Sequence, residues 1–215
     1  MNGDPEPAFP SYPDLRDPRV MVAAPRARRE ALAALWALTE RLTKLLREAR
    51  EPLIGQIKLA WWRDMMGLLA RDPAALPKGE PLLADLQATW AGRDGLDALV
   101  DAAEALLLAE DGQARAQAAG DFGERLFALS AGSEDEPARG RRWGLLWGAM
   151  LQEDAASAHA LFAAAKAADA PRSAFAGQRA LLMLDRWARA IAAADGARRW
   201  RREGLLLLRL GVFGR

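Results

Sequence analysis

Residues 28–46 read Arg28-Arg-Glu-Ala-Leu-Ala-Ala-Leu-Trp36-Ala-Leu38-Thr-Glu-Arg-Leu-Thr-Lys-Leu-Leu46. Large apolar side chains recur here at the spacing of a helix, at Leu32, Leu35, Trp36, Leu38, Leu42, Leu45 and Leu46. This spacing predicts one long helix that buries a single face against a core. The stretch is typical of a helical bundle.

The rest of the chain favours the same class of fold. Alanine, leucine, arginine and glutamate are abundant, while the strand formers valine, isoleucine and tyrosine are scarce. Proline and glycine fall between long periodic segments. We therefore expect one all-α domain over 26–215, preceded by an extended, proline-rich lead-in over 1–25. The expected helices span roughly 26–50, 52–71, 80–91, 95–110, 113–131, 138–152, 154–168, 173–194 (opened by Pro171 and capped by Ser173) and 197–212.

Composition limits the classes of function. The 30 basic and 29 acidic residues nearly cancel, so charge does not favour nucleic-acid binding. The chain has no cysteine, which excludes disulfides, thiolate nucleophiles and zinc–cysteine sites. No apolar run is long enough for a transmembrane helix, and the first residues do not resemble a secretory signal. We expect a cytoplasmic protein, with contact at the inner membrane as a further hypothesis.

Groups suited to catalysis are sparse. The one histidine, His159, lies in an alanine-rich segment, where a structural or solvated role is the usual one. Glycines at 140, 144 and 148 are spaced by four in a segment that also carries Trp143 and Trp147. Small residues at this spacing let two helices approach closely, so we interpret the glycines as packing positions. We expect no catalytic residue here.

The acidic residues form no convincing metal site. Asp97 and Asp101 are four apart and would share one helix face, but Asp94 and Glu104 beside them indicate a solvated surface. Farther along, the adjacent acids Glu153 and Asp154 point in different directions. We therefore expect no metal and no cofactor.

A second stretch, Arg50-Glu-Pro52-Leu-Ile-Gly55-Gln-Ile-Lys-Leu-Ala-Trp61-Trp62-Arg63-Asp64, resembles the squalene/phytoene synthase family. Together with 28–38 it is similar to that family's early helix, short break and Trp-Trp-Arg helix. Two later segments, 171–175 and 184–187, resemble the C-terminal helices of bacterial members. The resemblance covers 25–195 and implies a bundle of the isoprenoid-synthase (terpenoid synthase) type, here shortened.

Active members of that family condense two prenyl diphosphates, and two aspartate-rich motifs on facing helices hold Mg²⁺ against the diphosphates. The resemblance places the first set of acids at Thr43, Lys44 and Arg47, two of which are cations. The helix expected to carry the second motif has no acid between Trp143 and Gln152. A divergent branch of the family, which includes a mitochondrial complex I assembly factor, likewise keeps the Trp-Trp-Arg region and loses the acids.

The leading hypothesis is a non-catalytic binding or assembly factor that takes a protein partner or an isoprenoid or lipid ligand. On this view Trp61 and Trp62 pack the bundle, and Arg63 pairs with a neighbouring carboxylate. The candidate residues for binding a diphosphate or a partner are Lys44, Arg47, Trp62 and Arg63.

Two alternatives remain. The first is a Mg²⁺-dependent prenyltransferase with displaced metal ligands, Asp97 and Asp101 together with Glu153 or Asp154. The second is a protein that binds a membrane surface through 198–215, where Arg198-Arg-Trp200-Arg-Arg202 precedes the run Leu205–Leu208. The plainer interpretation of 198–215 is a last helix that packs its leucines on the bundle and leaves its arginines in solvent.

Overall fold

The computed structural model describes residues 12–49, 51–133 and 139–213, and this part of the chain is helical throughout, without a strand. The α-helices are α1 (Pro18–Met21), α2 (Arg29–Glu48), α3 (Pro52–Arg71), α4 (Pro81–Trp90), α5 (Leu96–Leu107), α6 (Gly112–Ala131), α7 (Arg141–Ala149), α8 (Ala155–Ala167), α9 (Arg179–Ala192) and α10 (Trp200–Phe213). Short 3₁₀ helices span Arg26–Arg28, Pro73–Ala75 and Arg172–Phe175. The predicted all-α class is confirmed.

The predicted helices match α2 to α8 and α10 to within three residues at each end. The run predicted over 173–194 is wrong in its first part. Ser173 lies inside a 3₁₀ helix, and Gly177 then adopts a positive φ of 71°, so α9 starts only at Arg179. An α-helix cannot pass through that backbone conformation, which glycine adopts without strain.

The described part of the lead-in, 12–25, is not extended. Asp17 accepts a hydrogen bond from the backbone of Arg19 and caps α1, whose first residue is Pro18. Tyr12 and Leu15 are buried in the same core as the long helices. The extended conformation predicted for 1–11 concerns residues outside the described part.

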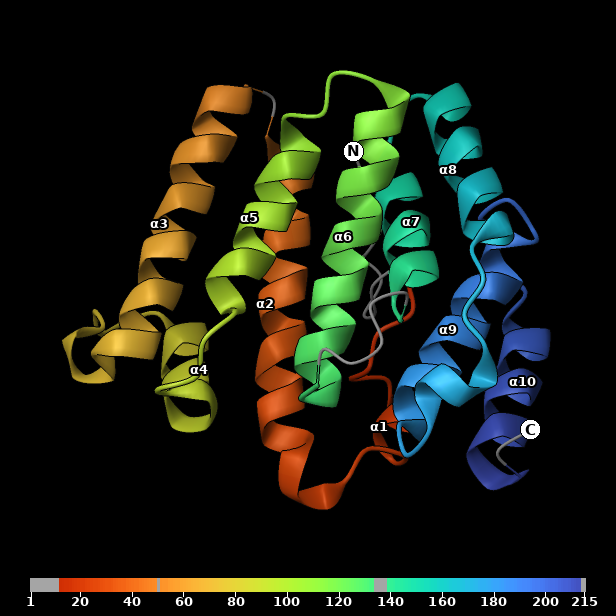
Figure 1. Ribbon diagram of the computed structural model, residues 1–215, viewed down its shortest axis with the longest axis horizontal. Helices are drawn as coiled ribbons and strands as arrows, with labels where there is room; N and C mark the ends of the chain where they lie inside the picture. The colour runs from red at the N-terminus through yellow and green to blue at the C-terminus, as the bar shows by residue number, and fades with distance from the viewer. Residues whose placement is uncertain (1–11, 50, 134–138, 214–215) are drawn as a thin grey trace, which may run out of the picture.

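The helices form a bundle with α3 at one edge and α10 at the other (Figure 1). In its centre α6 and α7 approach so closely that a Cβ built on Gly144 would lie 2.1 Å from the carbonyl oxygen of Ala119. Gly140 and Gly148 also face α6 at such short range. The interpretation of these glycines as packing positions is confirmed.

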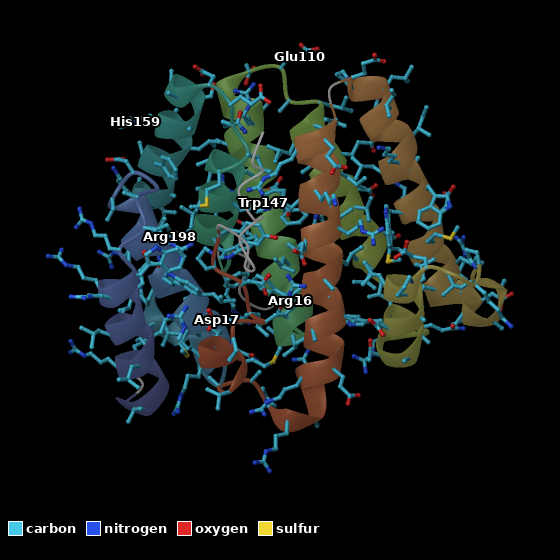
Figure 2. The ribbon with its side chains drawn as sticks, turned by 180° about the vertical axis from the view of Figure 1, so that it is seen from behind. Arg16, Asp17, Glu110, Trp147, His159 and Arg198 are labelled. Atoms are coloured by element: carbon cyan, nitrogen blue, oxygen red, sulfur yellow. The ribbon has the colours of Figure 1, made fainter. Side chains whose placement is uncertain are left out.

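Aromatic side chains fill the space around this contact. Trp147 of α7 stacks on Phe122 of α6 with ring centroids 4.1 Å apart. Trp143 meets Trp36 of α2 edge-on at 5.2 Å. All four rings are fully buried, and Figure 2 shows Trp147 well inside the molecule. The interior between α2, α6 and α7 is therefore occupied by side chains of the chain itself.

Candidate functional site

The two tryptophans of the Trp-Trp-Arg segment have different environments on α3. Trp62 is buried, and the guanidinium of Arg41 lies 5.5 Å from the centre of its ring. Trp61 contacts Trp62 edge-on at 5.1 Å but remains 41% exposed. The expectation that both rings pack the bundle is right for Trp62 and wrong for Trp61, which faces solvent.

Arg63 joins α3 to α5. Its guanidinium forms ion pairs with Asp101 and Glu104, so the expected pairing with a neighbouring carboxylate is confirmed. The hydrogen bond to Asp101 is the main cause that raises the pKa of Arg63 above its ordinary value. Asp97 is exposed one turn earlier on α5 and accepts a hydrogen bond from the backbone of Ala98. Asp101 thus already has a cationic partner within the chain.

Lys44 and Arg47 are exposed on α2. Lys44 lies 3.8 Å from Glu48, one turn farther along the same helix, whereas Arg63 directs its charge to α5. Lys44 and Arg63 therefore pair with different acids. A common binding site for Lys44, Arg47, Trp62 and Arg63 stays a prediction.

Thr43, at the third position where the resemblance places an acid, is part of the core. Its hydroxyl donates to the carbonyl oxygen of Thr39 at 2.7 Å and accepts from the indole N–H of Trp147 at 2.9 Å. The Tyr12 hydroxyl lies 3.4 Å away, and burial raises the pKa of that phenol, which keeps it neutral. The Thr43 hydroxyl therefore connects Tyr12, Thr39 and Trp147 in one buried polar network.

The acids near the start of α8 have local roles. Asp154 accepts hydrogen bonds from the backbone of Ala156 and Ser157. The side chain of Ser157 is the main cause that lowers the pKa of Asp154, and these backbone bonds lower it further. It is the cap of α8, while Glu153 beside it is exposed. His159 is exposed on the same helix (Figure 2). Within the described ranges, no group of three or more histidines and acids is placed to hold a metal ion.

A buried ion pair that the sequence pattern does not predict joins α7 to α9. One nitrogen of Arg142 lies 2.6 Å from both carboxylate oxygens of Asp185. The other terminal nitrogen donates to the carbonyl oxygen of Ala168, and Arg186 adds a second cation 3.3 Å from Asp185. The signal in the sequence was an acid within an otherwise apolar helix face, but nothing in it named Arg142 as the partner.

The helix α10 buries one side and exposes the other. Leu207 and Leu210 pack against the bundle, whereas the side chains of Trp200, Leu205, Leu208 and Val212 are between 60% and 67% exposed. Three arginines that lie among them, Arg201, Arg202 and Arg209, are exposed as well. Trp200 begins the helix on the side of Leu207 and lines a pocket with Arg198, so we call the other six residues the α10 face. No described helix is long and apolar enough to cross a membrane.

Glu203 fixes the start of α10, a role that the sequence pattern does not indicate. Its carboxylate accepts from the indole of Trp187 at 2.8 Å, from Arg198 at 3.0 Å and from the backbone of Arg199 at 2.5 Å. Burial alone would raise its pKa, but these donors together hold the pKa of Glu203 below its ordinary value. The exposed side of α10 is therefore held in a defined orientation.

A pocket of about 260 Å³ lies between 12–19, α9 and the start of α10. Its walls include Asp17, Arg198 and the rings of Trp187 and Trp200 (Figure 2 labels the first two). Burial alone would raise the pKa of Asp17, but the guanidinium of Arg19 at 2.7 Å, the backbone N–H of Arg19 and the charge of Arg198 together hold that pKa below its ordinary value. The carboxylate of Asp17 is thus already paired with a cation.

Comparison with known proteins found no family model that matches the chain, and neither a curated protein nor a solved structure matches it.

Proposed function

We propose that the protein is a non-catalytic binding or assembly factor of the squalene/phytoene synthase type that works at an anionic membrane surface. The observation that carries this proposal is the α10 face. The helix α10 lies at one edge of the molecule (Figure 1), and its exposed face combines apolar side chains and arginines. These are the residue types that settle a helix into the headgroup region of a bilayer.

The geometry of α10 supports contact with a flat surface. Successive residues of an α-helix are rotated by about 100°, so Leu205, Leu208 and Val212 fall on one side, opposite the buried Leu207 and Leu210. Arg201 lies on the same side and would meet lipid phosphates, with a contribution of about 1 kcal/mol for each arginine near the surface.

The non-catalytic part of the proposal is supported by the environment of the positions where the family resemblance places metal-binding acids. Thr43 bonds to Trp147 in the core, and the neighbouring rings occupy the interior between α2, α6 and α7. The alternative, a prenyltransferase with displaced ligands, gains no support from the geometry, because Asp101 pairs with Arg63 and Asp154 caps α8.

Vesicle co-sedimentation of the full chain tests the membrane contact. We expect binding to vesicles that contain phosphatidylserine, weaker binding at high salt, and little binding to purely zwitterionic vesicles. The double variant Leu205→Glu/Leu208→Glu should lose binding without loss of stability, since both positions are exposed. Val22→Glu/Leu108→Glu, which adds the same two charges at exposed positions outside α10, is the matched control and should bind like the parent. Equal sedimentation of all three proteins would refute the proposal.

A separate assay addresses catalysis. Farnesyl or geranylgeranyl diphosphate is incubated with the protein and Mg²⁺, and product and released diphosphate are measured. We expect no turnover. Turnover that depends on Mg²⁺ and disappears in Asp101→Asn would instead establish the prenyltransferase alternative.

A further inference from the structure

The edge helix α3 carries a second exposed apolar stripe. Its inner side buries Leu59, Trp62, Met66 and Leu69. Its outer side shows Leu53, Ile54, Ile57 and Trp61, which are between 41% and 67% exposed. In Figure 1 no helix covers α3 from outside. A continuous apolar stripe of this length on a surface marks an interaction site.

The charges along this stripe form a pattern centred on Trp61. Lys58 lies three residues before Trp61 and Asp64 three residues after it; Glu51 lies ten residues before and Arg71 ten residues after. All four are exposed, and none of them forms an ion pair within the described part of the chain. Each charge thus has an opposite charge at the same distance on the other side of Trp61.

Such a pattern is complementary to itself when it is reversed. If two copies of α3 pack antiparallel with Trp61 at the two-fold axis, Lys58 lies at the same level as the partner's Asp64. Glu51 lies at the same level as the partner's Arg71. The long side chains of Lys58 and Arg71 reach their acids across the seam between the helices. A parallel pairing would place like charges at the same level, which is unfavourable.

We propose that the α3 stripe is the contact between two copies of this chain, which pack antiparallel about Trp61. In that arrangement Ile57 meets the partner's Met65, and Ile54 meets the partner's Leu68. Met65 and Leu68 are part-buried against the core and lie within about 40° of Trp61 around α3, so their outer edges are on this side. The same surface then serves both copies, as an isologous two-fold contact requires. One helix stripe is a small interface, so the dimer is expected to dissociate on dilution.

Sedimentation equilibrium of the full chain, from micromolar to sub-millimolar concentration, tests the contact. The parent protein should show a monomer–dimer equilibrium, and Trp61→Glu should be monomeric throughout. Lys58→Glu should weaken dimerisation about tenfold, because two attractions become two repulsions. The charge swap Lys58→Glu/Asp64→Lys should restore it. Leu205→Glu, on α10, is the control and should dimerise like the parent.

The register has its own test, because the natural chain has no cysteine. Trp61→Cys should form an intermolecular disulfide readily under mild oxidation, since the two sulfurs meet at the axis. Leu53→Cys should not, because the two copies of that position would be about 24 Å apart along the helix pair. A parent protein that is monomeric at every concentration overturns the proposal. So does a charge swap that fails to restore dimerisation, or cross-linking at Leu53 as fast as at Trp61.

Discussion

The indole N–H of Trp147 donates to the hydroxyl oxygen of Thr43 across 2.9 Å, in the centre of the bundle. Both side chains are buried, and the Thr43 hydroxyl donates a hydrogen bond to the carbonyl oxygen of Thr39. The contact ties α2 to α7, the two helices on which the family resemblance leads one to expect metal-binding acids. In this chain the two helices meet through a neutral hydrogen bond among aromatic rings.

Replacing Thr43 tests that role. Thr43→Val keeps the shape but leaves the Trp147 N–H without an acceptor, so we expect the free energy of unfolding to fall by about 1–3 kcal/mol. Thr43→Asp places a charge among aromatic rings and should be much worse. The control Lys44→Asp, on the exposed side of α2, should cost only a few tenths of a kcal/mol through repulsion of Glu48. Urea denaturation measures all three, and equal effects at Thr43 and Lys44 would contradict the buried network.

The buried pair Arg142–Asp185 should be costly to break and inexpensive to replace. Asp185→Leu leaves the Arg142 guanidinium without its main partner in the core, and we expect a loss of about 3–5 kcal/mol. The double variant Arg142→Met/Asp185→Leu removes both charges and fills the space with carbon. It should be more stable than either single variant, because no unpaired charge remains. A double-mutant cycle from denaturation curves checks this, and simple additivity would show that the two residues do not interact.

The sequence predicts local features of this fold well, because they depend on neighbours along the chain. The 28–46 helix follows from its apolar spacing, and the glycines at 140, 144 and 148 predict that their helix approaches another one closely, although not that this helix is α6. The break before α9 was missed because the apolar pattern runs on through Gly177, whose backbone conformation ends the helix.

The contacts that define the candidate sites depend on distant parts of the chain. An arginine such as Arg63 can be expected to pair with an acid. The sequence does not tell that this acid comes from α5. Arg142 and Asp185 are joined only by the packing of α7 on α9. Nor does periodicity tell which leucines of α10 face outward, since that is set by the anchor at Glu203.

The close contact of α6 with α7 predicts a large effect from a single methyl group. Gly144→Ala would place Cβ 2.1 Å from the carbonyl oxygen of Ala119, and the backbone there cannot move without separating the helices. We expect the free energy of unfolding to fall by about 1–3 kcal/mol or more because of overpacking. Gly112→Ala, at the start of α6 with open space around it, is the matched control. It should be neutral or slightly stabilising, because alanine favours a helix more than glycine does. Thermal unfolding of both variants distinguishes these effects from a general intolerance of alanine.

Acid should loosen α10 from the bundle through Glu203. Because the folded protein holds the pKa of Glu203 below its ordinary value, the folded state binds fewer protons than the unfolded state as the pH falls. The stabilisation is therefore complete above the unfolded pKa of about 4.3 and is lost as the pH drops through the lower folded pKa. Glu203→Gln removes the titrating group, so the variant should be less stable at pH 7 and lose less stability on acidification. Glu153→Gln, an exposed acid, should leave the pH profile unchanged. Urea denaturation across this pH range provides the measurement, and parallel profiles for the parent protein and Glu203→Gln would show that the carboxylate does not anchor α10.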